Sequence, residues 1–181
     1  MADTEVKVLV SAIPALLDKK LGKEIITKAV ARIMGQDAIR EMKDMISKGI
    51  SPIRQAGRFD AYKATKESDP ALRNKGYPFS VKREYPSKRQ RPVNLHLSGK
   101  QLADLIFKVV PGKWGSAVEI GYFTPLSAAK ESGHREGVNG QPKRPTIPNS
   151  KLGESFAIRI DKILTETVQS AVDKFIKGEK N

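Results

Sequence analysis

The 181-residue sequence contains no cysteine, only two histidines and a single tryptophan. Without cysteine the chain can form neither a disulfide framework nor a thiolate metal site. No apolar run approaches the roughly 18 to 20 residues that cross a bilayer. The opening MADTEVKVLV also lacks the basic and apolar regions of an export signal. We therefore expect a protein that is made in the cytoplasm and does not enter a membrane.

The sequence also lacks a recognisable catalytic pattern. His96 and His134 fit no metal-ligand spacing, and there is no cysteine to complete a site. Ser98 is followed by Gly-Lys and does not stand in a Gly-x-Ser-x-Gly elbow, so we interpret it as a helix cap. The glycines after residue 132 do not follow the strand, glycine turn and helix order of a phosphate-binding loop. We expect no enzyme, no cofactor and no metal, with His134 as a capping or hydrogen-bonding residue.

Positive charge is abundant and unevenly distributed. The formal net charge is +13 and the isoelectric point is about 9.9. Residues 51–100 contain 12 Lys or Arg and four Asp or Glu, so that their net charge is 12 − 4 = +8. A field of this sign attracts polyanions, chiefly nucleic acid, and acidic protein surfaces.

Hydrophobic periodicity predicts helices at both ends of the chain. The first 48 residues indicate a short helix followed by a long one, which Gly49 ends. Residues 154–177 form an amphipathic pattern with one apolar stripe. These two long helices should cover whatever sheet the middle of the chain forms.

The middle of the chain predicts a small sheet with short helices. Residues 98–106 indicate a short helix, and residues 107–110 and 117–123 indicate two strands joined by a Pro/Gly turn. Thr124 and Pro125 predict the start of a helix over residues 126–132, with Gly133 as its stop. Residues 144–148 predict an edge strand. The fold class is α+β, a small and mostly antiparallel sheet packed against long N- and C-terminal helices, in a single domain of residues 1–181.

Residues 50–92 have a different character and indicate a long, basic, extended arm. They contain five prolines and many cations but no sustained period. Aromatic residues recur along them, which favours an arm that becomes ordered on binding a partner. Within it, KREYPSKRQR (residues 82–91) places five cations around one tyrosine, a composition that could neutralise phosphates while the ring stacks on a base. Direct nucleic-acid binding is therefore one hypothesis, and docking on an acidic protein is the other.

The order of four segments resembles the head-tail joining proteins of tailed bacteriophages, the neck or tail-completion proteins of virion morphogenesis. The segments are GISPIRQAGRFDAYKATK (residues 49–66), RPVNLHLSGKQLADL (91–105), AVEIGYF (117–123) and HREGVNGQPKRPTIPNSKLGESF (134–156), followed by a final helix. The resemblance spans most of residues 45–178. It implies a non-enzymatic virion component that joins the tail to the head connector as a ring, of six copies or, alternatively, of twelve.

The resemblance also implies partners and contact residues. The partners would be other copies of the chain and the adjoining connector and tail proteins, with DNA in the channel as a further candidate. A neighbouring subunit would cover the edge strand of residues 144–148. The subunit-interface candidates are His134, Gly137, Arg144, Pro145, Ile147 and Pro148. The candidates in the arm for contact with a partner or DNA are Arg54, Arg58, Lys82, Arg83, Lys88, Arg89 and Arg91. The alternative functions are a basic nucleic-acid-binding protein and a tail-tube or baseplate protein.

Overall fold

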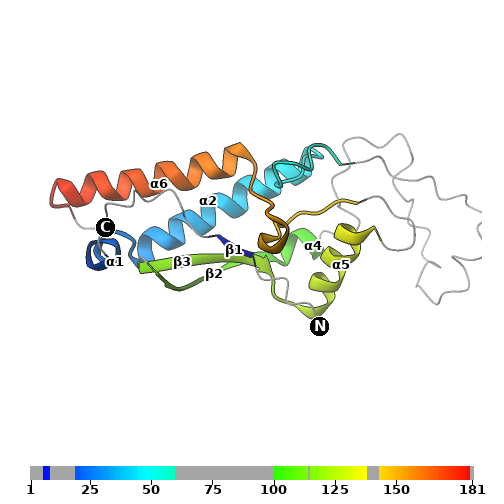
Figure 1. The fold of residues 1–181 in the computed structure, drawn as a ribbon, viewed down its shortest axis with the longest axis horizontal. Coiled ribbons are helices and arrows are strands. Elements are labelled where there is room, and N and C mark those ends of the chain that lie inside the picture. Colours follow the sequence, from blue (N-terminus) through cyan, green and yellow to red (C-terminus); the bar gives the residue numbers. More distant parts are fainter. Residues whose placement is uncertain (1–5, 9–18, 60–99, 114, 138–142, 180–181) are drawn as a thin grey trace, which may run out of the picture.

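The computed structural model describes residues 6–8, 19–59, 100–113, 115–137 and 143–179. The predicted α+β class is confirmed, because helices cover an antiparallel sheet (Figure 1). The elements are β1 (Val6–Val8), α1 (Lys19–Ile25), α2 (Lys28–Ser47), α4 (Lys100–Ala103), β2 (Leu105–Gly112), β3 (Gly115–Tyr122), α5 (Pro125–Glu136), the 3-10 helix η2 (Ser150–Leu152) and α6 (Ile158–Ile176).

The described sheet has the strand order β1-β3-β2, and both pairs are antiparallel. β2 and β3 form a long hairpin in which Leu105 lies opposite Tyr122 and Gly112 opposite Gly115. β1 pairs with the middle of β3 on the other side, with Val6 opposite Ile120. The sequence pattern had indicated a helix around Val6, and this prediction is wrong because these residues extend the sheet.

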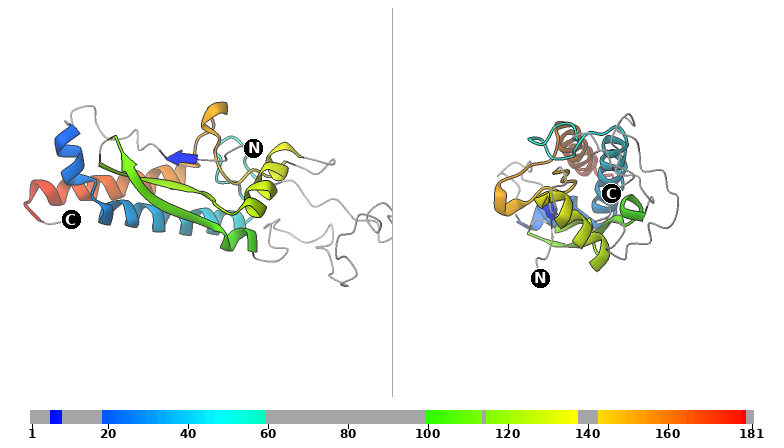
Figure 2. Two further views of the ribbon diagram at one scale, coloured as in Figure 1. Left: turned by 90° about the horizontal axis from the view of Figure 1, so that it is seen from below. Right: turned by 90° about the vertical axis from the view of Figure 1, so that its right-hand side faces the viewer.

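Helix α2 lies between the sheet and α6, so that two of its sides are covered (Figures 1 and 2). Thr27 caps its start by accepting a hydrogen bond from the Val30 amide at 3.3 Å, and Gly49 follows its end with a φ of 74°. The predicted stop at Gly49 is therefore confirmed. The buried residues of α2 are Val30, Ala31, Met34, Gly35, Ala38, Met42, Met45 and Ile46, and those of α6 are Ile160, Leu164, Val168 and Ala171.

The tip of the hairpin is attached to the junction between α1 and α2. The Ser116 amide donates to the Ile26 carbonyl at 2.8 Å. Gly115 has a φ of 122°, and a Cβ atom there would lie 2.7 Å from the same carbonyl oxygen. Only glycine satisfies both the backbone angle and the close approach. This contact places the start of α2 and the tip of the hairpin at one end of the molecule.

Two helix boundaries differ from the prediction. Leu105 and Ile106 belong to β2 and not to the preceding helix, because Leu105 is paired with Tyr122. Thr124 caps α5 as expected, since its side chain accepts from the Ser127 amide, but the helix continues through Gly133. It ends instead at Gly137, whose φ of 70° is left-handed. A glycine inside a helix costs stability but leaves the backbone hydrogen bonds intact, which explains the continuation.

Candidate functional site

Four residues of the segment 143–148 are buried (Arg144, Thr146, Ile147 and Pro148), and the segment is not a strand, which corrects the prediction of an edge strand over residues 144–148. Its backbone binds a side chain, the carboxylate of Glu131 on α5. Glu131 Oε1 accepts the amides of Thr146 and Ile147 at 2.8 and 3.1 Å, and Oε2 accepts the Thr146 hydroxyl at 2.6 Å. The Glu131 carboxylate thus accepts the hydrogen bonds that the carbonyl groups of a neighbouring strand would otherwise accept from these amides.

Glu131 is completely buried, and burial raises its pKa to about 7. The hydrogen bonds from Thr146 and Ile147 act in the opposite direction, as does the positive charge of Arg135, whose Nη2 lies 3.8 Å from Oε1. The donors occupy both carboxylate oxygens. The arrangement is therefore suited to anchoring a backbone segment, and it presents no open position to a reacting molecule.

Tyr122 of β3 extends this network into the sheet. Its hydroxyl lies 3.1 Å from Thr146 Oγ1, within the protein interior. Because the Thr146 hydroxyl already donates to Glu131, the Tyr122 hydroxyl must be the donor of this bond. Burial raises the pKa of Tyr122, and the charge of Glu131 adds to the effect. β3, α5 and the segment 143–148 are joined by this chain of bonds.

Arg135, one turn after Glu131, ties the same segment to the start of α6. Its Nη1 donates to Glu154 at 2.6 Å, and its Nη2 donates to the Ile147 carbonyl. Glu154 also accepts the Asn149 amide at 2.7 Å. Glu154 had been predicted to lie within the last helix, but α6 begins only at Ile158. We call Tyr122, Glu131, Arg135, Thr146 and Glu154 the polar joint.

Residues 50–59, predicted as the beginning of the extended arm, fold back and dock beside the polar joint. The buried Ser51 hydroxyl donates to the Pro145 carbonyl at 2.7 Å. Ile53 bridges to Phe156, and the Ala157 amide donates to the Pro52 carbonyl at 2.6 Å. Residues 60–92 of the predicted arm lie outside the described residues. For residues 50–59 the prediction of an extended arm is wrong, because contacts with the start of α6 hold them.

The interface candidates lie in or next to the polar joint. Ile147 is completely buried by its own chain, and Arg144 and Pro148 are buried as well, which leaves them little surface for a neighbour. Gly137 ends α5, and the His134 carbonyl accepts the Arg144 amide at 2.7 Å. Burial lowers the pKa of His134, and the positive charges of Arg144 and Lys130 lower it further. The His134 carbonyl makes a hydrogen bond, whereas its side-chain Nδ1 has no partner within the described residues.

The arm candidates are only partly covered by the structure. Arg54 forms an ion pair with Asp161 of α6 and donates its amide to the Ser155 carbonyl at 2.9 Å. Arg58 is exposed. Lys82, Arg83, Lys88, Arg89 and Arg91 lie outside the described residues, as do His96 and Ser98. The ion pair of Arg54 attaches the docked loop to the body of the molecule.

Sequence reasoning missed the central residue, Glu131. A signal was present, because residues 127, 131 and 135 are polar and recur every four residues. The single large apolar residue of α5, Leu126, is 64% exposed, whereas Ser127 and Glu131 are buried. A helix that lacks an apolar stripe but packs against a sheet must bury a polar one. That stripe marks the face that binds the segment 143–148.

Other kinds of site are not found in the described part of the chain. No group of three or more His, Asp or Glu residues there could hold a metal ion. None of the described helices combines the length and apolarity that a membrane span requires. Comparison with family models, curated proteins and solved structures found no match. The function must therefore be argued from the geometry of the chain itself.

Proposed function

We propose that this protein is a head-tail joining protein of a tailed bacteriophage, a non-enzymatic component of the neck or tail-completion ring. In this role copies of the chain form a ring, with six subunits favoured and twelve as the alternative. The ring contacts the head connector on one side and the tail on the other. The protein would be assembled in the bacterial cytoplasm and would remain in the virion.

One observation carries the proposal: the sequence segments that suggested the family contact one another in space. Ser51 of the first segment bonds to Pro145 of the last, and Phe156 bridges to Ile53. Leu105 of the second segment is paired with Tyr122 of the third, whose hydroxyl binds Thr146. These contacts support the view that the four segments form one structural unit.

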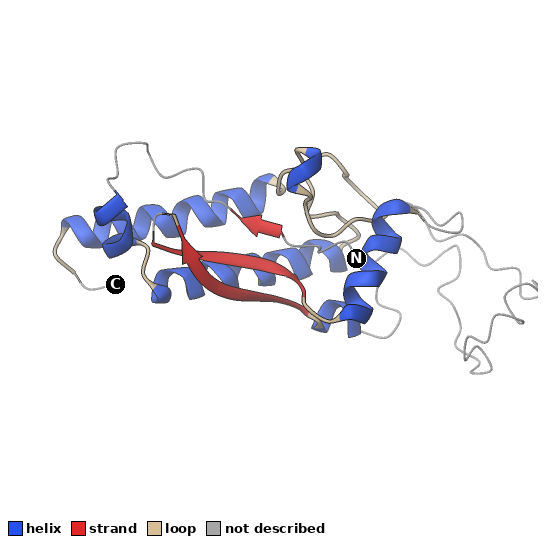
Figure 3. Ribbon diagram, turned by 60° about the horizontal axis from the view of Figure 1, so that its bottom comes forward, coloured by secondary structure: helices blue, strands red, loops and turns tan. Residues whose placement is uncertain are grey.

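The position of the polar joint suggests how the protein would act. The start of α4, which follows the segment 60–99, and the end of α5, which precedes the segment 138–142, lie at the same end of the body (Figures 1 and 3). Residues 60–99 contain nine Lys or Arg and four Asp or Glu, a net charge of 9 − 4 = +5. We propose that the polar joint fixes the base from which this basic segment reaches adjoining subunits or neck and tail proteins.

The contact between ring subunits would lie elsewhere than at residues 144–148. The predicted edge at residues 144–148 is buried except at Pro145, and β2 is the long edge strand of the described sheet. β2 carries Lys108 and Pro111, and proline has no amide to donate to a neighbouring strand. Lysine and proline are residues that keep sheet edges from pairing. We therefore propose a ring held by side-chain contacts at the α4–α5 end and not by a shared sheet.

The proposal is tested on particles of the phage that encodes the chain. Mass spectrometry should find the protein in purified virions, and gold-labelled antibody should mark the junction of head and tail. Labelling along the tail or at its tip would favour the tail-tube or baseplate alternative. Absence from purified virions would contradict the proposal.

The second candidate, a basic nucleic-acid-binding protein, is favoured by the net charge of +13. It predicts that the protein binds DNA in infected cells and is left behind when virions are purified. Native mass spectrometry of the free protein separates the two candidates further. A ring of six or twelve supports the joining role, whereas a monomer at all concentrations and in virion extracts contradicts it.

A further inference from the structure

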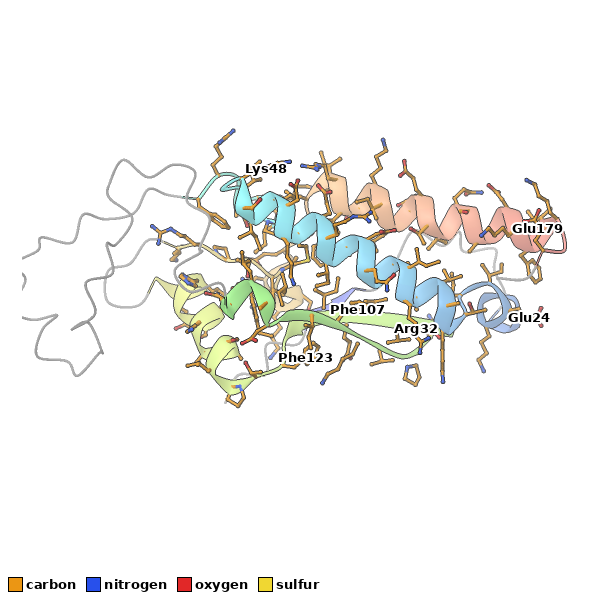
Figure 4. All side chains as sticks on the ribbon, turned by 180° about the vertical axis from the view of Figure 1, so that it is seen from behind. Glu24, Arg32, Lys48, Phe107, Phe123 and Glu179 are labelled. Carbon is orange, nitrogen blue, oxygen red and sulfur yellow. The ribbon has the colours of Figure 1, made fainter. Side chains whose placement is uncertain are left out.

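The end of the body opposite the polar joint contains an unneutralised basic surface. Residues 19–36 contain five Lys or Arg and one acid, a net charge of 5 − 1 = +4. Lys23 of α1 and Lys28 and Arg32 of α2 are exposed. Figure 4 shows Arg32 and Glu24 at the hairpin-tip end of the molecule, far from Lys48. We call Lys23, Lys28 and Arg32 the α1–α2 surface.

The ion pairs of the described chain are found elsewhere. In α2 they begin at Asp37, which binds Arg40 at 2.8 Å, and in α6 they end at Glu166, which lies 3.6 Å from Lys162. The remaining pairs involve Asp44, Arg54, Arg135, Glu154 and Arg159. Within the described ranges, none of the three cations of the α1–α2 surface has an acidic partner. Cations without internal partners leave a positive potential available to an external anion.

The spacing of Lys28 and Arg32 along α2 suits contact with a polymer that carries repeated charges. Lys28 and Arg32 lie four residues apart on the same face of α2, about 6 Å along the helix axis at 1.5 Å per residue. The hairpin tip fixes this part of α2 through the bond from the Ser116 amide to the Ile26 carbonyl. The surface is therefore held on rigid elements, independently of residues 60–99.

We propose that the α1–α2 surface binds the phosphate backbone of duplex DNA without reading its sequence. Lysine and arginine neutralise phosphates, which is sufficient for non-specific binding. Proteins that prefer single strands combine cations with aromatic platforms, and neither α1 nor α2 contains an aromatic residue. This inference goes beyond the proposed function and does not require it, because the surface would bind DNA in either candidate role.

The test is fluorescence anisotropy with a labelled random-sequence duplex, titrated with the full chain at several salt concentrations. The variant carries Lys23→Gln, Lys28→Gln and Arg32→Gln. Each phosphate contact contributes about 0.9 to the slope of log K against log salt, so three lost contacts should flatten the slope by about 2.7. Because the three side chains are exposed, circular dichroism and thermal melting should match the unmodified protein.

A matched control removes the same charge from the other end. Lys48, Lys143 and Lys151 are exposed, and their replacement by Gln should leave the slope of the DNA titration nearly unchanged. Equal losses in the two variants would overturn the proposal, because binding would then follow net charge alone. An unchanged slope in the α1–α2 variant would overturn it too.

Polyglutamate serves as the probe for an acidic protein partner. If the α1–α2 variant loses affinity for polyglutamate but keeps its affinity for duplex DNA, the surface binds acidic protein and the proposal is wrong. Presence of the protein in purified virions is measured separately. A protein found in virions whose α1–α2 variant binds DNA normally would contradict this inference and leave the joining role intact.

Discussion

Gly35 of α2 lies directly against the ring of Phe107 in β2. A Cβ atom on Gly35 would lie 2.3 Å from Phe107 Cδ2, far closer than two carbon atoms can approach. Both residues belong to the interface that joins α2 to the sheet. This contact sets how closely the long helix packs on the hairpin, and it makes glycine necessary at this position.

Gly35→Ala should therefore destabilise the protein, by about 1 to 3 kcal/mol for overpacking, although alanine is the better helix former. Urea unfolding monitored by circular dichroism measures the change. Gly133→Ala in α5 is the matched control, since a Cβ atom there meets nothing within 4 Å. It should be neutral or stabilise by up to about 1 kcal/mol. Adding Phe107→Leu to Gly35→Ala should recover part of the loss, and a stable Gly35→Ala protein would contradict the packing described.

Glu131 should make the stability depend on pH. Its pKa is raised from 4.5 to about 7, so the folded state holds the proton more tightly than the unfolded state. The contribution of Glu131 to the free energy of unfolding is fully present below pH 4.5, and it is lost as the pH rises toward 7. At about 1.36 kcal/mol per pKa unit it amounts to about 3 kcal/mol. The Glu131→Gln variant should lack this loss, and urea unfolding between pH 5 and 8 measures the difference.

The comparison with Glu131→Gln also separates the effect of Glu131 on the pH dependence of stability from the effect of its neighbour His134. The pKa of His134 is lowered from 6.5, so its contribution has the opposite sign and is lost as the pH falls. Tyr122 stays neutral throughout this range, because burial raises its pKa. His134 is present in both proteins and cancels in their difference. Parallel stability profiles for the two proteins would rule out a titrating Glu131.

The side chain of Ser51 should contribute more to the stability of the protein than the side chain of its exposed neighbour Ser47. The buried Ser51 hydroxyl donates to the Pro145 carbonyl at 2.7 Å and accepts the Ile53 amide at 3.2 Å. Ser51→Ala leaves both backbone groups without a partner and should cost about 1 to 3 kcal/mol. Ser47→Ala, which removes an exposed bond to the Asp44 carbonyl, should change stability by less than about 0.5 kcal/mol. Equal effects in thermal or urea unfolding would show that residues 50–59 are not anchored through Ser51.

Several elements could be predicted because their signals are local. The apolar stripes of α2 and α6 follow the helical period, and the two strands of the hairpin flank a Pro/Gly turn. Thr124 and Pro125 marked the start of α5 correctly, since a cap depends on the next three residues alone. The α+β class follows from these elements together.

The polar joint could not be predicted in this way. The segment 144–148 reads as a strand, because Thr and Ile between prolines favour an extended backbone, and nothing in it reveals that Glu131 will bind its amides. Likewise, the composition after residue 50 indicates an arm, while the bonds of Ser51, Ile53 and Arg54 depend on residues about a hundred positions later.

The amino-acid sequence by itself determined the charge, the long amphipathic helices, the hairpin and the helix caps, because each depends on spacing within a few residues. The tertiary structure alone decided which polar groups are buried together, and hence that Glu131 holds the segment 143–148 and that residues 50–59 dock on the start of α6. The physical reason is that a buried carboxylate is tolerated only where donors from other elements converge on it, and such convergence exists only once the chain has folded.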